Sequence, residues 1–278
     1  MAIKLIVSDI DNTLIDSRCE ISPETTEALE RASAQGVKIC LATSRSAECS
    51  RFLLDKVGNL THMIMFTGCR MVDMKTGELL SHSVLPKNIS DDLADYFASF
   101  EDVYVEAAVE GKYVLPTYAI SYILRINVFD VYMRRDLLPI LIEAGDLKEY
   151  FAAQQKPVEK FYAYTKDDDR FRRLLENMPH RDELKIACTT HNGMDIMGAD
   201  VNKGTALRLL MQRLGLQGSE VMVCGDSEND SDMFLPEVFK VAVGNAFPSL
   251  KAKADFVSRS NNEHGVAYAV NRFVLGEG

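Results

Sequence analysis

The stretch KLIVSDIDNTLIDS, residues 4–17, decides the fold. It opens with an apolar run that is typical of a short strand buried on both faces, and it continues directly into Asp9 and Asp11. Ligands of an open parallel sheet lie beyond the carboxyl ends of its strands. Because side chains alternate along a strand, Asp9 and Asp11 are expected to point into one crevice while Ile10 turns toward the core. Turn residues are the alternative interpretation of this acidic pair.

Short apolar runs alternate with helical patterns in the first part of the chain. A helix is predicted from about Ser22 to Gln35, with Ser22 as N-cap, Pro23 in the first turn and Gly36 after the last turn. Strands are predicted at VKICLAT and HMIMF on either side of further helical sequence. Strands separated by helices, with little polar alternation inside them, predict an α/β fold with a doubly wound, Rossmann-like parallel sheet.

The pattern changes after the third predicted strand. The stretches MVDMKTGELLSHSVL and VYVEAAVEGKYVL each resemble two strands around a glycine-containing turn, which favours antiparallel hairpins. The α/β rhythm returns with EVMVCG, KVAVG and DFVS. We therefore expect a core domain of residues 1–84 and 193–278, interrupted by an inserted α+β domain of residues 85–192.

A second group of acids follows the predicted strand EVMVCG. The stretch DSENDSD, residues 226–232, contains Asp226, Glu228, Asp230 and Asp232. One or two acids at this place are explained by the positive end of a helix, but four acids without a neighbouring Lys or Arg exceed that need. Carboxylate oxygens from two strand ends are the hard ligands that Mg²⁺ prefers. The sequence therefore predicts a Mg²⁺ site formed with Asp9.

Hydroxyl and amine side chains stand at other predicted element ends. Thr43 and Ser44 follow the second strand and are candidates for holding an anion, although both are also ordinary capping residues. Lys203 opens the predicted helix in NKGTALRLL, where the positive helix end disfavours a cation. A negative group is therefore expected beside Lys203, with a solvated surface lysine as the alternative.

Charge and cysteine content restrict the class of protein. Asp and Glu number 41 against 31 Lys and Arg, so the net charge of −10 argues against a nucleic-acid-binding surface. Apolar runs stay below the roughly 18 residues that a membrane span needs. The six cysteines include no CxxC pair, which favours reduced thiols. We expect a cytoplasmic monomer or homodimer that binds neither nucleic acid nor membrane.

Four motifs resemble, in the right order, those of the haloacid dehalogenase-like (HAD) hydrolases. They are DIDNT, LATSR, NKGTAL and GDSEND. The insertion between the second and third motifs resembles the α/β cap domain of the Cof-type (type IIB cap) subfamily, and FTGCRMVD is similar to that subfamily's Asn-Gly-Ala stretch. Ser44 replaces the usual glycine of Thr-Gly-Arg, and Thr67 replaces the usual asparagine. These departures affect the anion pocket and the cap hinge rather than a reacting group.

The resemblance implies a Mg²⁺-dependent phosphatase that hydrolyses small phosphorylated metabolites, such as sugar phosphates, through an aspartyl-phosphate. Asp9 is implied as the nucleophile and Asp11 as the general acid and base. The implied metal ligands are Asp9, the backbone carbonyl of Asp11, Asp226 and Asp230. The implied phosphate ligands are Thr43, Ser44, Lys203 and Asn229.

Two other activities fit the same residues. A phosphomutase or other phosphotransferase would pass the phosphoryl group to a different acceptor. A receiver-like switch would hold a phosphoryl group on Asp9 in an acidic Mg²⁺ pocket without turning over. The acid at Asp11 and the size of the insertion argue against the receiver.

Overall fold

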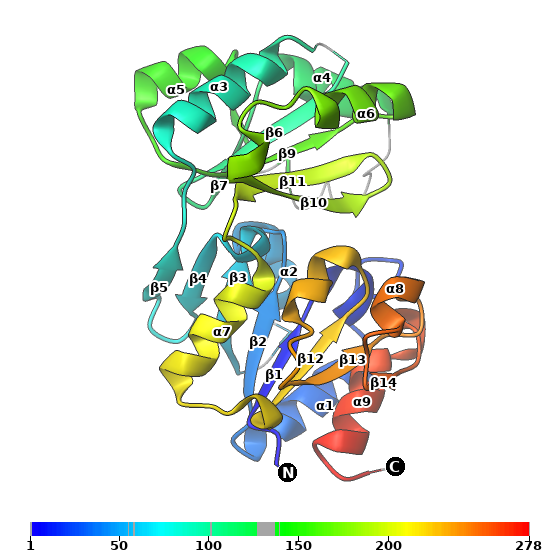
Figure 1. Cartoon of the computed structure of the whole chain (residues 1–278). Helices are drawn as coiled ribbons and strands as arrows, with labels where there is room; N and C mark the ends of the chain where they lie inside the picture. The colour runs from blue at the N-terminus through cyan, green and yellow to red at the C-terminus, as the bar shows by residue number, and fades with distance from the viewer. Residues whose placement is uncertain are drawn as a thin grey trace. The chain divides into compact units, whose positions relative to one another are not determined.

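The computed structural model of the chain describes residues 2–54, 56–57, 59–100, 102–126, 137–138 and 140–277. It divides into two compact units, which are shown in Figure 1. The first unit, the core domain, consists of Met1–Ser81 and Asn202–Gly278. The second unit, the cap domain, is the insertion His82–Val201. Each unit has its own sheet.

The core domain is built on a sheet whose described strands number eight, in the order β14-β13-β12-β1-β2-β3-β4-β5. The strands are β1 (Leu5–Ser8), β2 (Lys38–Ala42), β3 (Leu60–Met65), β4 (Arg70–Asp73), β5 (Leu79–His82), β12 (Val221–Gly225), β13 (Phe239–Ala242) and β14 (Phe256–Val257). The strands from β14 to β3 pair in parallel, and β4 runs antiparallel to β3. The predicted doubly wound parallel sheet is confirmed.

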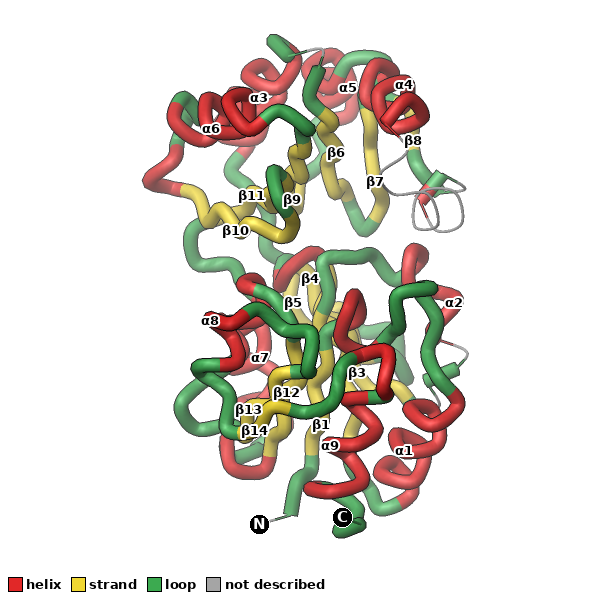
Figure 2. Tube along the Cα trace, turned by 90° about the vertical axis from the view of Figure 1, so that its right-hand side faces the viewer, coloured by secondary structure: helices red, strands yellow, loops and turns green. Residues whose placement is uncertain are grey.

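Helices cover both faces of the core sheet. The described α-helices are α1 (Pro23–Ala34), α2 (Arg51–Leu54), α7 (Lys203–Leu214), α8 (Pro248–Lys251) and α9 (Gly265–Phe273). Figure 2 shows α7 on one side of the strands and α1 and α9 on the other. The predicted start of the first helix is confirmed, because the Ser22 hydroxyl oxygen accepts a hydrogen bond from the Thr25 amide at 3.1 Å. None of the helices within the described ranges has both the length and the apolarity to cross a membrane.

The register of the central strands brings three sequence motifs to one edge. Ser8, the last residue of β1, is aligned with Cys224 of β12 on one side and with Leu41 of β2 on the other. Because these strands are parallel, the residues that follow them emerge at the same edge of the sheet. Asp9 and Asp226 therefore leave neighbouring strands side by side.

The cap domain is an α+β unit with a separate sheet, in the order β10-β11-β9-β6-β7-β8. Its strands are β6 (Tyr104–Val109), β7 (Lys112–Leu115), β8 (Ile142–Glu143), β9 (Val158–Tyr164), β10 (Leu184–Thr190) and β11 (Gly193–Gly198). Its described helices are α3 (Lys87–Ala98), α4 (Thr117–Ile126), α5 (Leu147–Gln154) and α6 (Asp168–Glu176), and Figures 1 and 2 show them above the strands. An apolar cluster that includes Phe97, Phe151 and Phe161 joins the helices to the sheet.

The boundaries between the two units differ from the predicted ones. The first lies after Ser81 rather than after residue 84, and the second lies after Val201 rather than after residue 192. The larger difference arises because β11 pairs antiparallel with both β10 and β9, so residues 193–198 complete the sheet of the cap domain. A chain that re-enters the core at residue 193 would leave β9 without this partner.

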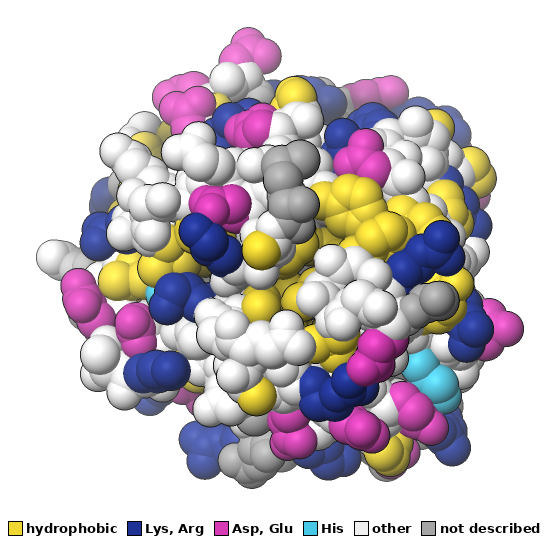
Figure 3. Space-filling model, turned by 90° about the horizontal axis from the view of Figure 1, so that it is seen from below, with side chains coloured by type: hydrophobic (Ala, Val, Ile, Leu, Met, Phe, Trp, Pro, Cys, Tyr) yellow, Lys and Arg dark blue, Asp and Glu magenta, His cyan; other side chains and the backbone are white. Residues whose placement is uncertain are grey.

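The edge of the core sheet where the strands begin carries an apolar pocket. Its volume is about 290 Å³, and it is lined by Ile3, Ser219, Glu237, Val238, Phe239, Asp255 and Phe273. Figure 3 views the protein from this side, where hydrophobic side chains gather near the middle and charged side chains of both signs lie around them. This pocket contains none of the predicted site residues, which lie at the opposite edge.

Candidate active site

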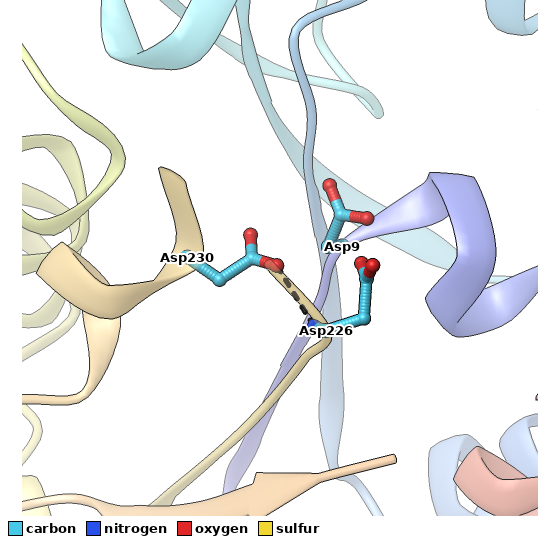
Figure 4. A group of neighbouring side chains, drawn as sticks. All are labelled: Asp9, Asp226 and Asp230. Atoms are coloured by element: carbon cyan, nitrogen blue, oxygen red, sulfur yellow. Dashed lines mark hydrogen bonds between the residues drawn. The ribbon is translucent and has the colours of Figure 1, made fainter. Parts of the chain in front are cut away.

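Asp9, Asp226 and Asp230 come together at the carboxyl edge of the core sheet. One carboxylate oxygen of each lies within 4.8 Å of the others, although Asp9 follows β1 and the other two follow β12. Figure 4 shows Asp9 and Asp226 beside each other at the two strand ends, with Asp230 reaching toward them from the turn after β12. All three are buried. Three carboxylates that share a buried site repel one another unless positive charge or protons intervene.

Part of the positive charge comes from Lys203. Its Nζ donates to Asp9 Oδ1 at 2.6 Å and to Asp230 Oδ1 at 2.7 Å, and the side chain is completely buried. Gly204 allows the start of α7 to pack closely against the backbone at Asp232, because a Cβ there would lie 1.9 Å from the Asp232 carbonyl oxygen. The negative group expected beside Lys203 is therefore a pair of carboxylates. Although burial opposes the charged form, these carboxylates hold the pKa of Lys203 above its usual value.

The carboxylates still carry an excess of negative charge. Burial raises the pKa of Asp9 well above its usual value, and Asp230 and Asp226 raise it further against the opposing effect of Lys203. Burial, followed by the Asp230 carboxylate, raises the pKa of Asp226 to about 7. Three ionised carboxylates against one ammonium group leave two negative charges. A divalent cation would supply the charge that balances them.

The hydrogen bonds separate the roles of the three acids. Asp230 Oδ1 is taken by Lys203, and its Oδ2 accepts from the backbone amides of Asp226 at 2.9 Å and Ser227 at 3.1 Å. Asp226 Oδ1 accepts from Thr13 Oγ1 at 2.9 Å. Asp230 therefore fixes the turn after β12 and shares Lys203 with Asp9, while Asp9 and Asp226 each use one carboxylate oxygen, Oδ1, in the hydrogen bonds described. This set of hard oxygen donors fits Mg²⁺.

Asp11 lies outside the carboxylate group and pairs with an arginine instead. Arg45 donates from Nε to Asp11 Oδ2 at 2.8 Å and from Nη2 to Asp11 Oδ1 at 2.6 Å. Arg45 is 3% exposed, whereas the Asp11 side chain is 42% exposed. The guanidinium also donates to the Cys49 carbonyl and lies over the Phe52 ring. A fixed bidentate partner therefore orients the carboxylate of Asp11.

Sequence reasoning assigned no role to Arg45. It is the last residue of LATSR, in which only the two hydroxyl residues before it were predicted to bind an anion. The sequence nevertheless contained a feature that predicts an ion pair for Arg45, because an arginine at the end of an apolar strand needs an acidic partner. Asp11, at the end of the neighbouring strand, was available.

The predicted phosphate ligands stand around this edge. Thr43 is buried, and its Oγ1 accepts from the Arg45 amide at 3.1 Å, so the hydroxyl can direct its hydrogen to an anion. Ser44 follows it and is half-buried. Asn229 is buried in the turn after β12, and its Oδ1 accepts from Ser227 Oγ at 2.7 Å. This bond leaves the Asn229 amide nitrogen as the donor for an anion.

A strained segment links these ligands to Lys203. Phe66 and Thr67 have φ of 50° and 57°, and Gly68 follows with φ of 109°. The Thr67 amide donates to the Thr43 carbonyl at 3.0 Å, and a Cβ on Gly68 would lie 2.3 Å from the Asn202 carbonyl oxygen. A left-handed backbone is unfavourable for a β-branched residue and acceptable for asparagine. The replacement at Thr67 therefore strains a buried contact between the second motif and α7.

Comparisons with known proteins show which family this chain is similar to. A model of the haloacid dehalogenase-like hydrolase family matches residues 6–270. A 5-amino-6-(5-phospho-D-ribitylamino)uracil phosphatase of Bacillus subtilis is 26% identical over 300 residues, which cover 99% of each chain.

Solved structures share the fold of the whole chain. A haloacid dehalogenase-like hydrolase of B. subtilis matches with a TM-score of 0.85 at 24% identity, covering 97% of this chain and 99% of that one. A HAD subclass IIB sugar phosphatase matches with a TM-score of 0.78 at 22% identity, covering 97% and 98%. The similarity therefore includes both the core and the cap domain.

Proposed function

The chain belongs to the haloacid dehalogenase-like hydrolase family, and we propose that it is a Mg²⁺-dependent phosphatase that hydrolyses small phosphomonoesters through an aspartyl-phosphate. The observation that carries this proposal is the buried group of Asp9, Asp226, Asp230 and Lys203 at one sheet edge. Such a group places a carboxylate nucleophile beside positive charge, which is what attack on a phosphoryl group requires.

In the first step, the Asp9 carboxylate attacks phosphorus, and the bond from phosphorus to the ester oxygen breaks. Lys203 and the hydroxyl of Thr43 stabilise the negative charge on the phosphoryl oxygens, with Ser44 and the Asn229 amide as further donors. The short strand β1 is completely buried between its neighbours. The nucleophile therefore starts from a rigid position, which favours a productive geometry.

In the second step, water attacks the phosphorus of the aspartyl-phosphate and regenerates Asp9. Asp11 gives a proton to the departing alkoxide in the first step and removes one from the attacking water in the second, which is general acid and base catalysis by one residue. Arg45 holds the carboxylate of Asp11 beside the nucleophile's strand. The ion pair must loosen when Asp11 takes up its proton.

The carboxylates of Asp9 and Asp226 and the backbone carbonyl of Asp11 would hold Mg²⁺, with Asp230 behind them. When bound, the cation supplies charge neutralisation among the acids and polarises the phosphoryl oxygens. Lys203 already compensates part of the charge, so the residues present leave room for one divalent cation rather than for two.

The proposed substrates are small phosphorylated metabolites with hydroxyl-rich leaving groups, sugar phosphates first. This choice is supported by the names of similar proteins, a 5-amino-6-(5-phospho-D-ribitylamino)uracil phosphatase and a sugar phosphatase. The net charge of −10 agrees with a small ligand rather than a nucleic acid.

A screen of phosphorylated metabolites tests the proposal. Release of inorganic phosphate is measured for each compound with Mg²⁺ and with EDTA. We expect release from at least one sugar phosphate or related monoester, only when Mg²⁺ is present. A product phosphorylated at a new position without free phosphate would identify a phosphotransferase instead. A stable phosphoprotein without turnover would identify a switch.

A further inference from the structure

The turn that carries Asp11 is held from outside by a side chain that the mechanism does not use. Asn12 follows Asp11 and has a left-handed backbone with φ of 56° and ψ of 5°. Its carbonyl oxygen accepts a hydrogen bond from Asn245 Nδ2 at 2.8 Å. Asn245 lies in the loop after β13, more than two hundred residues away in the chain. Two distant segments of the core domain thus meet beside Asp11.

Asn245 is exposed, yet both ends of its amide are engaged. While Nδ2 donates to the Asn12 carbonyl, Oδ1 accepts from the Asn261 amide at 2.9 Å. Both partners are backbone groups of fixed polarity, so the orientation of the Asn245 amide is determined. Asn261 is buried and donates from Nδ2 to the Ile15 carbonyl at 2.9 Å. The two asparagines therefore fix both ends of the turn from Asp11 to Ile15.

We propose that Asn245 is a positioning residue for Asp11, which it orients through the peptide of Asn12. This inference rests on the phosphatase activity proposed above. The Asp11 side chain is half-exposed, and Arg45 orients it at its carboxylate. The remaining determinant of where the carboxylate lies is therefore the position of the Asp11 backbone. The left-handed conformation of Asn12 is an uncommon one that the Asn245 bond helps to hold. Loss of the bond lets the turn relax and displaces the acid from the leaving group.

Displacement of the Asp11 acid and general loss of structure affect kcat/KM for two kinds of substrate differently. Departure of an alkoxide needs the proton of Asp11, whereas p-nitrophenolate leaves without one. The ratio kcat/KM reports the steps up to departure of the leaving group. A variant with a displaced acid is therefore slow with an alkyl phosphate and close to wild type with p-nitrophenyl phosphate. A smaller folded fraction lowers both values equally.

Two substitutions separate the two hydrogen bonds of Asn245. Asn245→Ala removes both bonds. Asn245→Asp keeps an oxygen for the Asn261 amide and loses only the donor to the Asn12 carbonyl. We expect both variants to lose kcat/KM with the alkyl phosphate by about 10²-fold, the cost of misplacing a reacting group, and to stay within about twofold of wild type with p-nitrophenyl phosphate.

Asn262→Asp is the matched control. It adds the same charge to the neighbouring loop, and it keeps the oxygen that accepts from the Ser17 amide at 2.9 Å, outside the turn of Asp11. We expect kcat/KM of this variant to match wild type with both substrates.

Two results would overturn the inference. One is wild-type kcat/KM on the alkyl phosphate in Asn245→Asp, which would mean that the donor to Asn12 is dispensable. The other is an equal loss on both substrates, which would mean that Asn245 only supports folding. A wild-type protein that hydrolyses neither substrate would instead refute the proposed phosphatase function, so the two failures are distinguishable.

Discussion

The ammonium nitrogen of Lys203 lies 2.6 Å from Oδ1 of Asp9, across a separation of 194 residues in the chain. Both side chains are buried, and the pair joins the start of α7 to the end of β1. In the proposed reaction, the lysine opposes protonation of the nucleophile and lowers the repulsion between Asp9 and an incoming phosphate. Removal of one partner would leave the other charge buried and uncompensated, which is strongly destabilising.

Replacing Lys203 by methionine removes the charge at similar side-chain length. Asp9 and Asp230 then remain buried without their ammonium partner, so we expect the free energy of unfolding at pH 7 to fall by about 3 kcal/mol. Loss of a donor to the phosphoryl oxygens should lower kcat by about 10²-fold or more. Urea titration and steady-state kinetics measure the two effects.

Lys4→Met is the control for this substitution. Lys4 pairs with Glu220 at 2.5 Å, but its side chain is 58% exposed, so its removal should cost less than about 1 kcal/mol. Equal stability losses in the two variants would contradict the structural role of the buried pair.

Asp11→Asn should separate the two chemical steps. With p-nitrophenyl phosphate the leaving group departs unassisted, but hydrolysis of the aspartyl-phosphate still needs a base. We expect a burst of one p-nitrophenolate per enzyme molecule, followed by turnover slowed by about 10² to 10⁴-fold. Stopped-flow absorbance measures the burst. Linear release from the first turnover at the wild-type rate would show that Asp11 is not the base.

Thr67→Asn should stabilise the protein. The backbone of Thr67 has φ of 57°, and relief of such strain in a β-branched residue is worth about 1 kcal/mol in the free energy of unfolding. Thr67→Val keeps the branch and loses the hydroxyl, so it should give no gain. Thermal unfolding of the two variants tests the difference. A gain in the valine variant that matched the asparagine variant would exclude backbone strain as the cause.

Glu106 should make the stability of the cap domain depend on pH. Burial raises the pKa of Glu106 to about 7 from an ordinary value of 4.5, against the opposing hydrogen bond from Tyr104 and the charge of Lys160. Between these two values the folded state binds a proton that the unfolded state has lost. The stability that this proton contributes is therefore lost as the pH rises toward and through about 7.

Glu106→Gln cannot ionise and keeps an acceptor for the Tyr104 hydroxyl. Relative to wild type, its free energy of unfolding should rise by about 2 kcal/mol between pH 5 and pH 8. Urea titrations at the two pH values, followed by circular dichroism, measure this difference. If Glu106→Gln and wild type differ in free energy of unfolding by the same amount at both pH values, the assigned shift of the Glu106 pKa is contradicted.

The sequence predicted the parts of the site that follow from strand ends and charge. Apolar runs that lead into Asp9 and Asp226 identify neighbouring parallel strands, and Lys203 at a helix start requires an acidic partner. Arg45 and Asn245 were not assigned, because their roles depend on contacts between loops that have no periodic signal. Asn245 in particular donates to the backbone carbonyl of Asn12. Because every residue has a backbone carbonyl, the sequence does not indicate which one is the acceptor.

The sequence pattern also did not predict where the insertion ends. Residues 193–198 form a strand whose place is set by antiparallel pairing with β10 and β9. A strand that belongs to the cap sheet has the same apolar composition as one that belongs to the core sheet. Pairing partners, which the linear pattern does not give, decide between them.

The proposed covalent mechanism is tested by locating the phosphoryl group during turnover. The Asp11→Asn protein is mixed with p-nitrophenyl phosphate in Mg²⁺, quenched in acid, and mapped by peptide mass spectrometry. The proposed mechanism predicts a phosphoryl group on Asp9, formed in step with the burst, and none in a protein that also carries Asp9→Asn. A phosphoryl group on another residue, or a burst that survives Asp9→Asn, would contradict it.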